Sequence, residues 1–268
     1  MYQMSNFHFA LIFASSILAG LANAVAGGGT FFSFPALTAG GLSSLVANAT
    51  NAVAVTPGHL LAAVTYREIL GRSKQRLIVL GVASAFGAIA GAYLLTITSA
   101  ATFAKLVPWL LLFATVSFAG GPYLQKAINA KKAPEKTAEQ ASDPEKEKSS
   151  GVSVKSSISY FLASIYGGYF GAGQGIVLMT ILTLTGVSDV QEANALKNAV
   201  ATIVSLIAVI VLAFKGFILW KYGIPMIIGA TIGGLFGGKL AKRMNKQTLR
   251  AIVIIIGTVL TVSYFVKA

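Results

Sequence analysis

The chain consists of two similar halves, residues 17–118 and 162–265. Both halves open with clustered glycines, and further along both carry an Asn-Ala-Val stretch followed by two glycines four residues apart. The matching positions, which need a one-residue gap between the glycines and the asparagine, are 27–29 with 171–175, 49–54 with 196–201, and Gly87 and Gly91 with Gly233 and Gly237. A duplicated, glycine-broken apolar unit is typical of secondary transporters, in which the substrate site lies where the two halves meet.

Composition places these units in a membrane. Of 268 residues, 55% are hydrophobic and 11% charged, with a mean hydropathy of +0.75. Soluble domains carry about 25% charged residues, so the sequence predicts an integral membrane protein. The net charge of +13 is compatible with nucleic-acid binding, but Lys and Arg gather at the ends of apolar stretches, as the positive-inside rule expects. We therefore expect a lipid bilayer as partner and no nucleic acid.

Residue types that build metal and thiol sites are scarce. The chain has no cysteine, which excludes disulfides and thiolate ligands. Its two histidines, His8 and His59, are far apart and belong to no metal-binding motif. GxSxG and HExxH elements and an intramembrane aspartate pair are also missing from the sequence, which argues against a membrane-embedded enzyme. We expect no metal site, no cofactor and no catalytic residues.

Apolar stretches follow one another along both halves. They fall at 5–26, 30–40, 44–66, 76–97, 102–124, 157–172, 175–186, 189–213, 221–241 and 247–267. A helix needs about 20 residues to cross a bilayer, so the stretches 30–40 and 175–186, which directly follow the glycine clusters, are too short. The sequence predicts an all-α membrane protein, a polytopic helical bundle in which each repeat contains a short, glycine-broken half-helix.

The segment between the halves is polar and rich in Lys, Glu and Pro, which is typical of disorder. We expect a first transmembrane repeat over 1–125, a disordered cytoplasmic linker over 126–156 and a second transmembrane repeat over 157–268. The start of the chain resembles a signal peptide, but residues 1–6 carry no positive charge and the glycines that follow recur in the second half. We interpret it as a retained membrane segment.

The charges of the loops predict opposite orientations for the two repeats. Basic residues crowd the loop between the third and fourth segments of the first half, but the loop between the fourth and fifth segments of the second half. Because basic loops stay in the cytoplasm, loops 67–76 and 242–250 and the linker are expected on that face, with both termini outside. The repeats would then be inverted, with an odd number of crossings each.

The glycine clusters predict breaks in the backbone within the bilayer. A break is tolerated in hydrocarbon only where it is buried in protein or lines a wet cavity. The half-helix that follows presents free N–H groups and a partial positive charge, which suit an anion. Close helix packing through small residues is the alternative, and we favour it for the later glycines. We interpret the clusters as a site formed by Gly28, Gly29, Thr30, Gly173, Gln174 and Gly175.

Four asparagines within the apolar stretches extend this site. Asn48 and Asn51 lie about one helical turn apart, as do Asn194 and Asn198, so each pair shares a helix face. His59, further along the same segment as Asn51, is a candidate proton carrier or a hydrogen-bonded structural histidine.

Lys197 is the basic residue that we place deepest in the bilayer. It lies ~12 Å into its segment by helical rise, where a lysine costs about 2.5–3.5 kcal/mol. We expect it to face a cavity or a partner, with snorkelling or pairing with Glu192 as alternatives.

These features together resemble the sulfite exporter TauE/SafE family, also called the four-toluene sulfonate uptake permeases. The resemblance rests on the glycine cluster that opens each half, the apolar half-helix ending in Gly40-Gly41 or Thr185-Gly186, and the Ala-x-x-Asn-Ala-Val stretch. It covers nearly the whole chain except the linker. It implies a carrier of sulfite, sulfonates or related anions in a bacterial or archaeal inner membrane. The charged linker departs from the family pattern, as does Lys197 at the position where the first repeat has Thr50.

The sequence thus predicts a secondary transporter that moves a small organic or sulfur-containing anion across the inner membrane. A coupling proton or sodium ion is expected as a further partner. An anion channel is the alternative, and a membrane-embedded enzyme is the third class considered.

Overall fold

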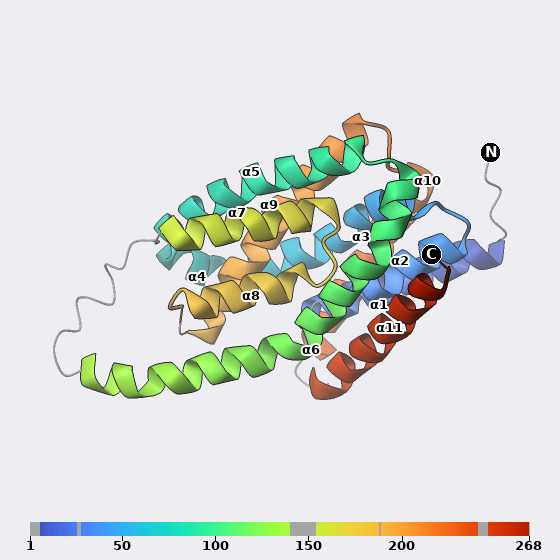
Figure 1. Ribbon diagram of the computed structural model, residues 1–268. Coiled ribbons are helices and arrows are strands. Elements are labelled where there is room, and N and C mark those ends of the chain that lie inside the picture. Colours follow the sequence, from blue (N-terminus) through green and yellow to red (C-terminus); the bar gives the residue numbers. More distant parts are fainter. Residues whose placement is uncertain (1–5, 26–27, 140–153, 188, 241–245, 268) are drawn as a thin grey trace.

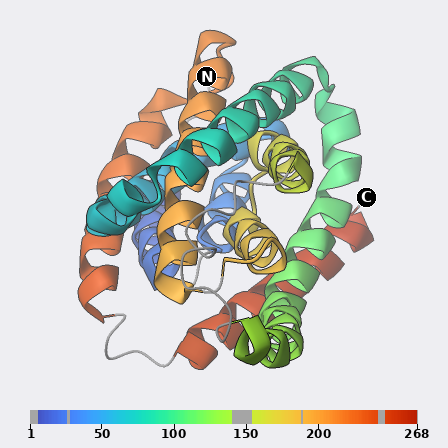
Figure 2. The same ribbon diagram turned by 90° about the vertical axis from the view of Figure 1, so that its left-hand side faces the viewer.

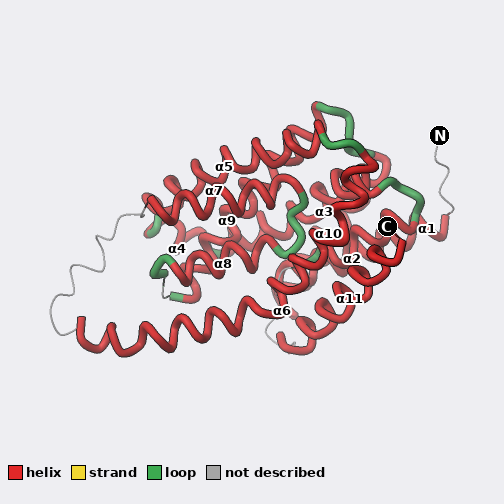
Figure 3. Tube along the Cα trace, viewed as in Figure 1, coloured by secondary structure: helices red, strands yellow, loops and turns green. Residues whose placement is uncertain are grey.

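The computed structural model describes residues 6–25, 28–139, 154–187, 189–240 and 246–267. Every regular element in these ranges is a helix (Figure 3). The first half contains α1 (Asn6–Val25), α2 (Thr30–Ala39), α3 (Ser44–Thr65), α4 (Arg67–Arg72), α5 (Lys74–Ile97) and α6 (Ala100–Glu139). The second half contains α7 (Val154–Tyr169), α8 (Gln174–Leu184), α9 (Val190–Phe214), α10 (Trp220–Leu240) and α11 (Lys246–Lys267).

The helix bounds follow the apolar stretches closely, with two additions. The short helix α4 occupies the basic loop after α3, and α6 continues to Glu139. The first part of the expected linker, 126–139, therefore belongs to α6, and its Ala, Lys and Glu residues have high intrinsic helix propensity. The rest of the linker, 140–153, and part of the loop 242–250 lie outside the described residues.

The helices have the length and surface of a membrane protein. Within the described residues, five are long and apolar enough to cross a bilayer: those within α1, α5, α6, α9 and α11. Large apolar side chains also point outward along the bundle, among them Phe86, Phe113, Val116, Ile228 and Ile255. Such side chains suit contact with lipid, whereas a water-soluble bundle turns polar residues outward.

Helices of one half pack against helices of the other. α1 lies against α10, α5 against α7, and α3 against α9, so the halves interlock (Figures 1 and 2). α6 and α11 lie side by side along one edge of the bundle. The start of α1 and the end of α11 lie at one end of the bundle, and α4 lies at the other (Figure 1).

Glycines allow α5 to lie close against α7, and α10 close against α1. A Cβ on Gly87 or Gly91 of α5 would overlap the carbonyl oxygens of Phe161 and Ile165 in α7. A Cβ on Gly233 of α10 would overlap the carbonyl oxygen of Ile17 in α1 in the same way, and one on Gly229 would overlap the Ser16 hydroxyl of α1 and press on the Phe13 carbonyl oxygen. The contacts of Gly237, which the sequence matches with Gly91, lie outside what the structure describes. The expectation of close packing is confirmed for Gly87, Gly91, Gly229 and Gly233.

The short helices α2 and α8 both begin in the middle of the bundle. Gly28 precedes α2 with φ +85°, and Gly173 precedes α8 with φ +70°. Both values lie in the left-handed region, where glycine carries no Cβ penalty. From these breaks α2 leads toward the end of the bundle where α11 finishes, whereas α8 leads toward the end with α4 (Figures 1 and 3). The expectation of two separate short helices is confirmed.

Candidate functional site

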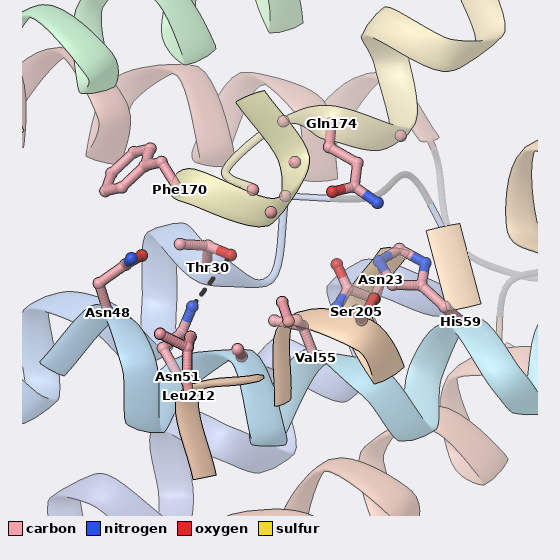
Figure 4. A pocket seen from close by; sticks show the side chains of 18 residues that line it. Asn23, Thr30, Asn48, Asn51, Val55, His59, Phe170, Gln174, Ser205 and Leu212 are labelled. Atoms are coloured by element: carbon pink, nitrogen blue, oxygen red, sulfur yellow. Dashed lines mark hydrogen bonds between the residues drawn. The ribbon is translucent and has the colours of Figure 1, made fainter. Parts of the chain in front are cut away.

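A polar cavity, here called the inner cavity, lies between the first turns of α2 and α8. Its volume is about 30 Å³. Walls come from both halves, and Figure 4 shows their side chains facing a common space. The lining includes eight of the residues expected from the sequence: Gly28, Thr30, Asn48, Asn51, His59, Gly173, Gln174 and Gly175. Gly29 was also expected but does not line the cavity; it lies between Gly28 and Thr30, which do.

On the first-half side of the cavity, side chains close the break before α2. The amide oxygen of Asn23 in α1 accepts a hydrogen bond of 2.8 Å from the backbone N–H of Gly29. The amide nitrogen of Asn51 donates to the Thr30 hydroxyl at 3.2 Å (Figure 4), and the Asn51 oxygen accepts from the Ser33 hydroxyl. The start of α2 is thus clamped to α1 and α3. The bond to Asn23 satisfies the Gly29 N–H, which was expected from the sequence to bind an anion.

Asn48, beside the same cavity, forms a hydrogen bond between the two halves. Its amide nitrogen donates to the backbone oxygen of Tyr169, at the end of α7, with a distance of 2.9 Å. Because α7 ends there, that carbonyl has no helical donor of its own. Asn48 therefore caps α7 from α3, while its own oxygen stays beside the cavity.

On the second-half side, the break before α8 is less filled. Gln174 is 5% exposed and projects into the cavity from the first residue of α8 (Figure 4). Hydrogen bonds at this break run from the N–H groups of Gln174 and Ile176 to the backbone oxygens of Gly171 and Gly173. Within the described part of the chain, no partner is found for the N–H of Gly175, which also lines the cavity.

Several polar atoms around the cavity lack hydrogen-bond partners within the described residues. They are Asn23 Nδ2, Asn48 Oδ1, His59 Nδ1 and Gln174 Nε2, each on a side chain that is at least nine-tenths buried. Such an atom costs about 1–3 kcal/mol when left unsatisfied, so four around one space point to a polar occupant. The two amide nitrogens are donors to an anion or a water.

A larger pocket, here called the outer pocket, lies on the other side of Gly175. Its volume is about 350 Å³, and Gly175 lines both spaces. Asn194 and Lys197 of α9 line the outer pocket rather than the inner cavity. Asn194 donates to the oxygen of Val190 in its own helix at 2.9 Å. A Cβ on Gly175 would lie 3.8 Å from Lys197 Cδ, so the lysine stem passes the point where the two spaces meet.

Asn198 and His59 link Lys197 to the inner cavity. Asn198 is 5% exposed, and it lies against His59, which is within electrostatic reach of Lys197. Glu192, the alternative partner considered for Lys197, instead binds Arg76 of α5 at 2.8 Å. Among the described residues, no group of three or more His, Asp or Glu side chains is placed to hold a metal ion.

Sequence reasoning missed Asn23 and Ser205, which line the inner cavity, and Ser33, whose hydroxyl bonds to Asn51. Asn23 stood out only beside a possible signal-peptide cleavage point, and Ser33 carried no visible signal. Ser205 lines the inner cavity from α9, and its hydroxyl donates to the oxygen of Ala201 in its own helix. The polar spacing on α9, with Asn198, Thr202 and Ser205 on one side of the helix, could have identified it.

A bundle of apolar helices around a buried polar cavity defines a multi-pass membrane protein with an internal site. The family model for sulfite exporter TauE/SafE matches residues 12–264, so this chain belongs to that family of membrane transporters.

Its curated relatives include bacterial proteins of similar length. A protein of Haemophilus influenzae called "Probable membrane transporter protein" is 25% identical over 253 residues, which are 94% of this chain and 92% of that one. "Probable membrane transporter protein YfcA" of Escherichia coli K12 is 25% identical over 97% of this chain and 91% of its own length. "Probable membrane transporter protein ORF9" of Sinorhizobium is 25% identical over 96% of this chain and 92% of its own length. No solved structure matches the chain.

Proposed function

We propose that this protein is a secondary transporter that moves a small sulfur-containing or organic anion, such as sulfite or a sulfonate, across the bacterial inner membrane. The observation that carries the proposal is the inner cavity, where buried amide atoms that have no partner among the described residues lie beside the first turn of α8. A helix N-terminus attracts negative charge. Lys197, at the junction of the two spaces, adds a full positive charge nearby.

The substrate would be held by both halves. Gln174 and the N–H of Gly175 donate from α8, Asn23 and Thr30 line the opposite wall, and Lys197 approaches with Asn198 and His59 behind it. Asn48 and Asn51 hold the walls in place through their bonds to Tyr169 and Thr30. His59 is the candidate carrier for a coupling proton, and a sodium ion is the alternative coupling partner.

We infer that the two halves are inverted repeats. The pairings α1 with α10 and α5 with α7 exchange equivalent helices between the halves, and α3 meets its own counterpart α9. A two-fold axis through the middle of the bundle would produce this pattern. The opposite directions of α2 and α8 in Figure 1 support the same arrangement.

The size of the inner cavity favours a carrier over a channel. A space of about 30 Å³ holds on the order of two water molecules. A sulfonate is larger, so the helices around the cavity have to move before it can enter. Such movement is the basis of alternating access, whereas a channel keeps a continuous path. Saturable counter-transport in liposomes supports the carrier, and flux that rises linearly with concentration favours the channel.

A binding screen tests the proposal directly. Purified protein is heated with sulfite, thiosulfate, sulfonates or carboxylates, since a ligand of the folded state raises the melting temperature. We expect at least one anion to stabilise the wild type and the Lys215→Gln control. Lys197→Gln should fold and insert normally but lose the stabilisation. Unchanged affinity and transport in Lys197→Gln would mean that backbone and amide groups form the site alone.

Cysteine labelling tests the orientation of the repeats. The chain has no cysteine of its own, so single cysteines at Ser73 and Asn245 report without background. Both positions should react with an impermeant reagent from the cytoplasmic side. Labelling of the two cysteines from opposite faces would rule out the inverted arrangement.

A further inference from the structure

We propose that the outer pocket is a second anion-binding site, which collects the anion at the entrance to the inner cavity; this rests on the proposed anion transport. The pocket receives two basic side chains, Lys197 from α9 and Arg250 from α11. Its polar remainder consists of the amides of Gln125, Asn194 and Gln247. Asp and Glu do not occur among the described residues that line it. Two positive charges at a recessed wall concentrate anions.

Two backbone carbonyl groups of α6 hold the Arg250 side chain in place, and one of them lacks its helical hydrogen-bond donor. Pro122 has no N–H, so the carbonyl of Phe118, four residues earlier, loses its helical donor. Arg250 Nε donates to that carbonyl at 3.1 Å, and its Nη2 donates to the carbonyl of Ala119 at 2.5 Å. The Tyr123 ring lies 5.2 Å from the guanidinium carbon.

These contacts fix the position of the guanidinium without cancelling its charge. Carbonyl groups and an aromatic ring are dipolar or quadrupolar partners, so the Arg250 side chain keeps its full charge beside the pocket. A preorganised cation binds an anion with little loss of side-chain entropy. α6 changes direction near its middle (Figures 1 and 2). Gly120, Gly121 and Pro122 lie at the middle of its range in the sequence. Pro122 therefore accounts both for the bend in α6 and for the fixed position of the Arg250 guanidinium.

Gly175 forms the connection between the two spaces. It is the residue that lines both, and the stem of Lys197 passes beside it. An added methyl group would make an ordinary contact with that stem at 3.8 Å, so Gly175→Ala is compatible with the fold. The same methyl group would narrow the passage. An anion bound between Arg250 and Lys197 would pass this point to reach Gln174.

The experiment measures the charge preference of the outer pocket independently of transport. Met179, on the pocket wall, is replaced by cysteine. The rates of modification by an anionic and a cationic methanethiosulfonate reagent are then compared. Both reagents attack the same thiolate, so the reactivity of the cysteine cancels in the ratio. Thr185→Cys, on the exposed turn after α8, gives the reference ratio.

We expect the anionic reagent to be favoured at Met179→Cys by about 10-fold relative to the reference. Lys197→Gln should lower this preference severalfold. Arg250→Gln should do the same, and it is introduced together with Pro122→Ala, which restores the helical donor to Phe118 and so protects the fold. A ratio equal to the reference, or one that neither substitution changes, would overturn the outer site.

Transport measurements separate this result from the proposed function. Gly175→Ala should slow anion transport severalfold while leaving the reagent ratio unchanged, and Gly71→Ala, on open surface in α4, should alter neither. Wild-type transport without any anion preference at Met179→Cys overturns the outer site alone. An anion preference in a protein that transports no anion counts against the proposed transport.

Discussion

The two short helices, α2 and α8, have similar backbones but different surroundings. At the start of α2, the Gly29 N–H is bonded to Asn23 and the Thr30 hydroxyl to Asn51. At the start of α8, the Gln174 amide nitrogen is unpartnered within the described residues, and Lys197 lies beside Gly175. The break before α2 is therefore clamped by side chains of its own half, whereas the first residue of α8 keeps a buried amide donor without a partner among the described residues. A shared fold does not imply equal chemistry in its two halves.

This difference is confined to the breaks before α2 and α8, because the glycine-mediated packing of α5 on α7 resembles that of α10 on α1. Gly91 of α5 against Ile165 of α7 and Gly233 of α10 against Ile17 of α1 are similar contacts, and each joins a helix of one half to a helix of the other. Substitutions at these glycines should affect both halves equally, whereas substitutions near the breaks should not.

The largest effect is expected for leucine at the two packing glycines. In Gly91→Leu and Gly233→Leu the new side chain meets a backbone oxygen that cannot move aside. Overpacking typically costs about 1–3 kcal/mol and occasionally more, and we expect these variants at or above the upper limit. The measurement is the yield of monodisperse protein and its melting temperature.

Gly71→Leu is the matched control for this comparison. Gly71 has open space around the position of its Cβ, so the variant should melt close to the wild type. A large loss in one half and none in the other would show that the two helix contacts are not equivalent.

Alanine substitutions at the matched asparagines, Asn51 and Asn198, should distinguish a role in stabilising α2 from a role in anion binding. Asn51→Ala removes the partner of both Thr30 and Ser33, which are buried, so we expect a loss of about 1–3 kcal/mol of stability. Asn198 Oδ1 has no partner within the described residues, so Asn198→Ala should cost about 1 kcal/mol or less. Anion binding should respond more strongly to Asn198→Ala. The two variants are compared by melting temperature with and without the stabilising anion; equal losses of stability would contradict the contrast.

The sequence predicted the helices well because the length of an apolar stretch is a local property. The breaks at Gly28 and Gly173 were predictable for the same reason, since glycine clusters interrupt apolar runs locally. The helical part of the expected linker was missed because its charged composition was read as a sign of disorder, although Ala, Lys and Glu also favour helix.

The chemistry of the site was harder to predict because it depends on contacts between distant segments. Lys197 and Asn194 were expected beside the inner cavity, but they line the outer pocket. The capping of Gly29 by Asn23 and the bond between Arg250 and Phe118 depend on side-chain directions that the sequence pattern does not determine. Periodicity identifies which residues are buried together, but it does not show which of them satisfy one another.

The smallest effect on stability is expected at the corner of the fold between α3 and α5, where the first half contains an additional helix. The first half inserts α4 between α3 and α5, and Arg76 after it binds Glu192 of α9 at 2.8 Å, with Ser73 donating to the same carboxylate oxygen. At the other corner, Lys221 instead lies 5.8 Å from the centre of the Tyr222 ring. The side chains of Arg76 and Glu192 are about a quarter exposed, and partly exposed pairs contribute about 0.2–1 kcal/mol. Glu192→Gln should therefore lower the melting temperature slightly, and less so at high salt, where the pair is screened in the wild type. A shift as large as that of Asn51→Ala would contradict this expectation, because the ion pair between the halves would then contribute as much stability as the hydrogen bonds that clamp α2 within the first half.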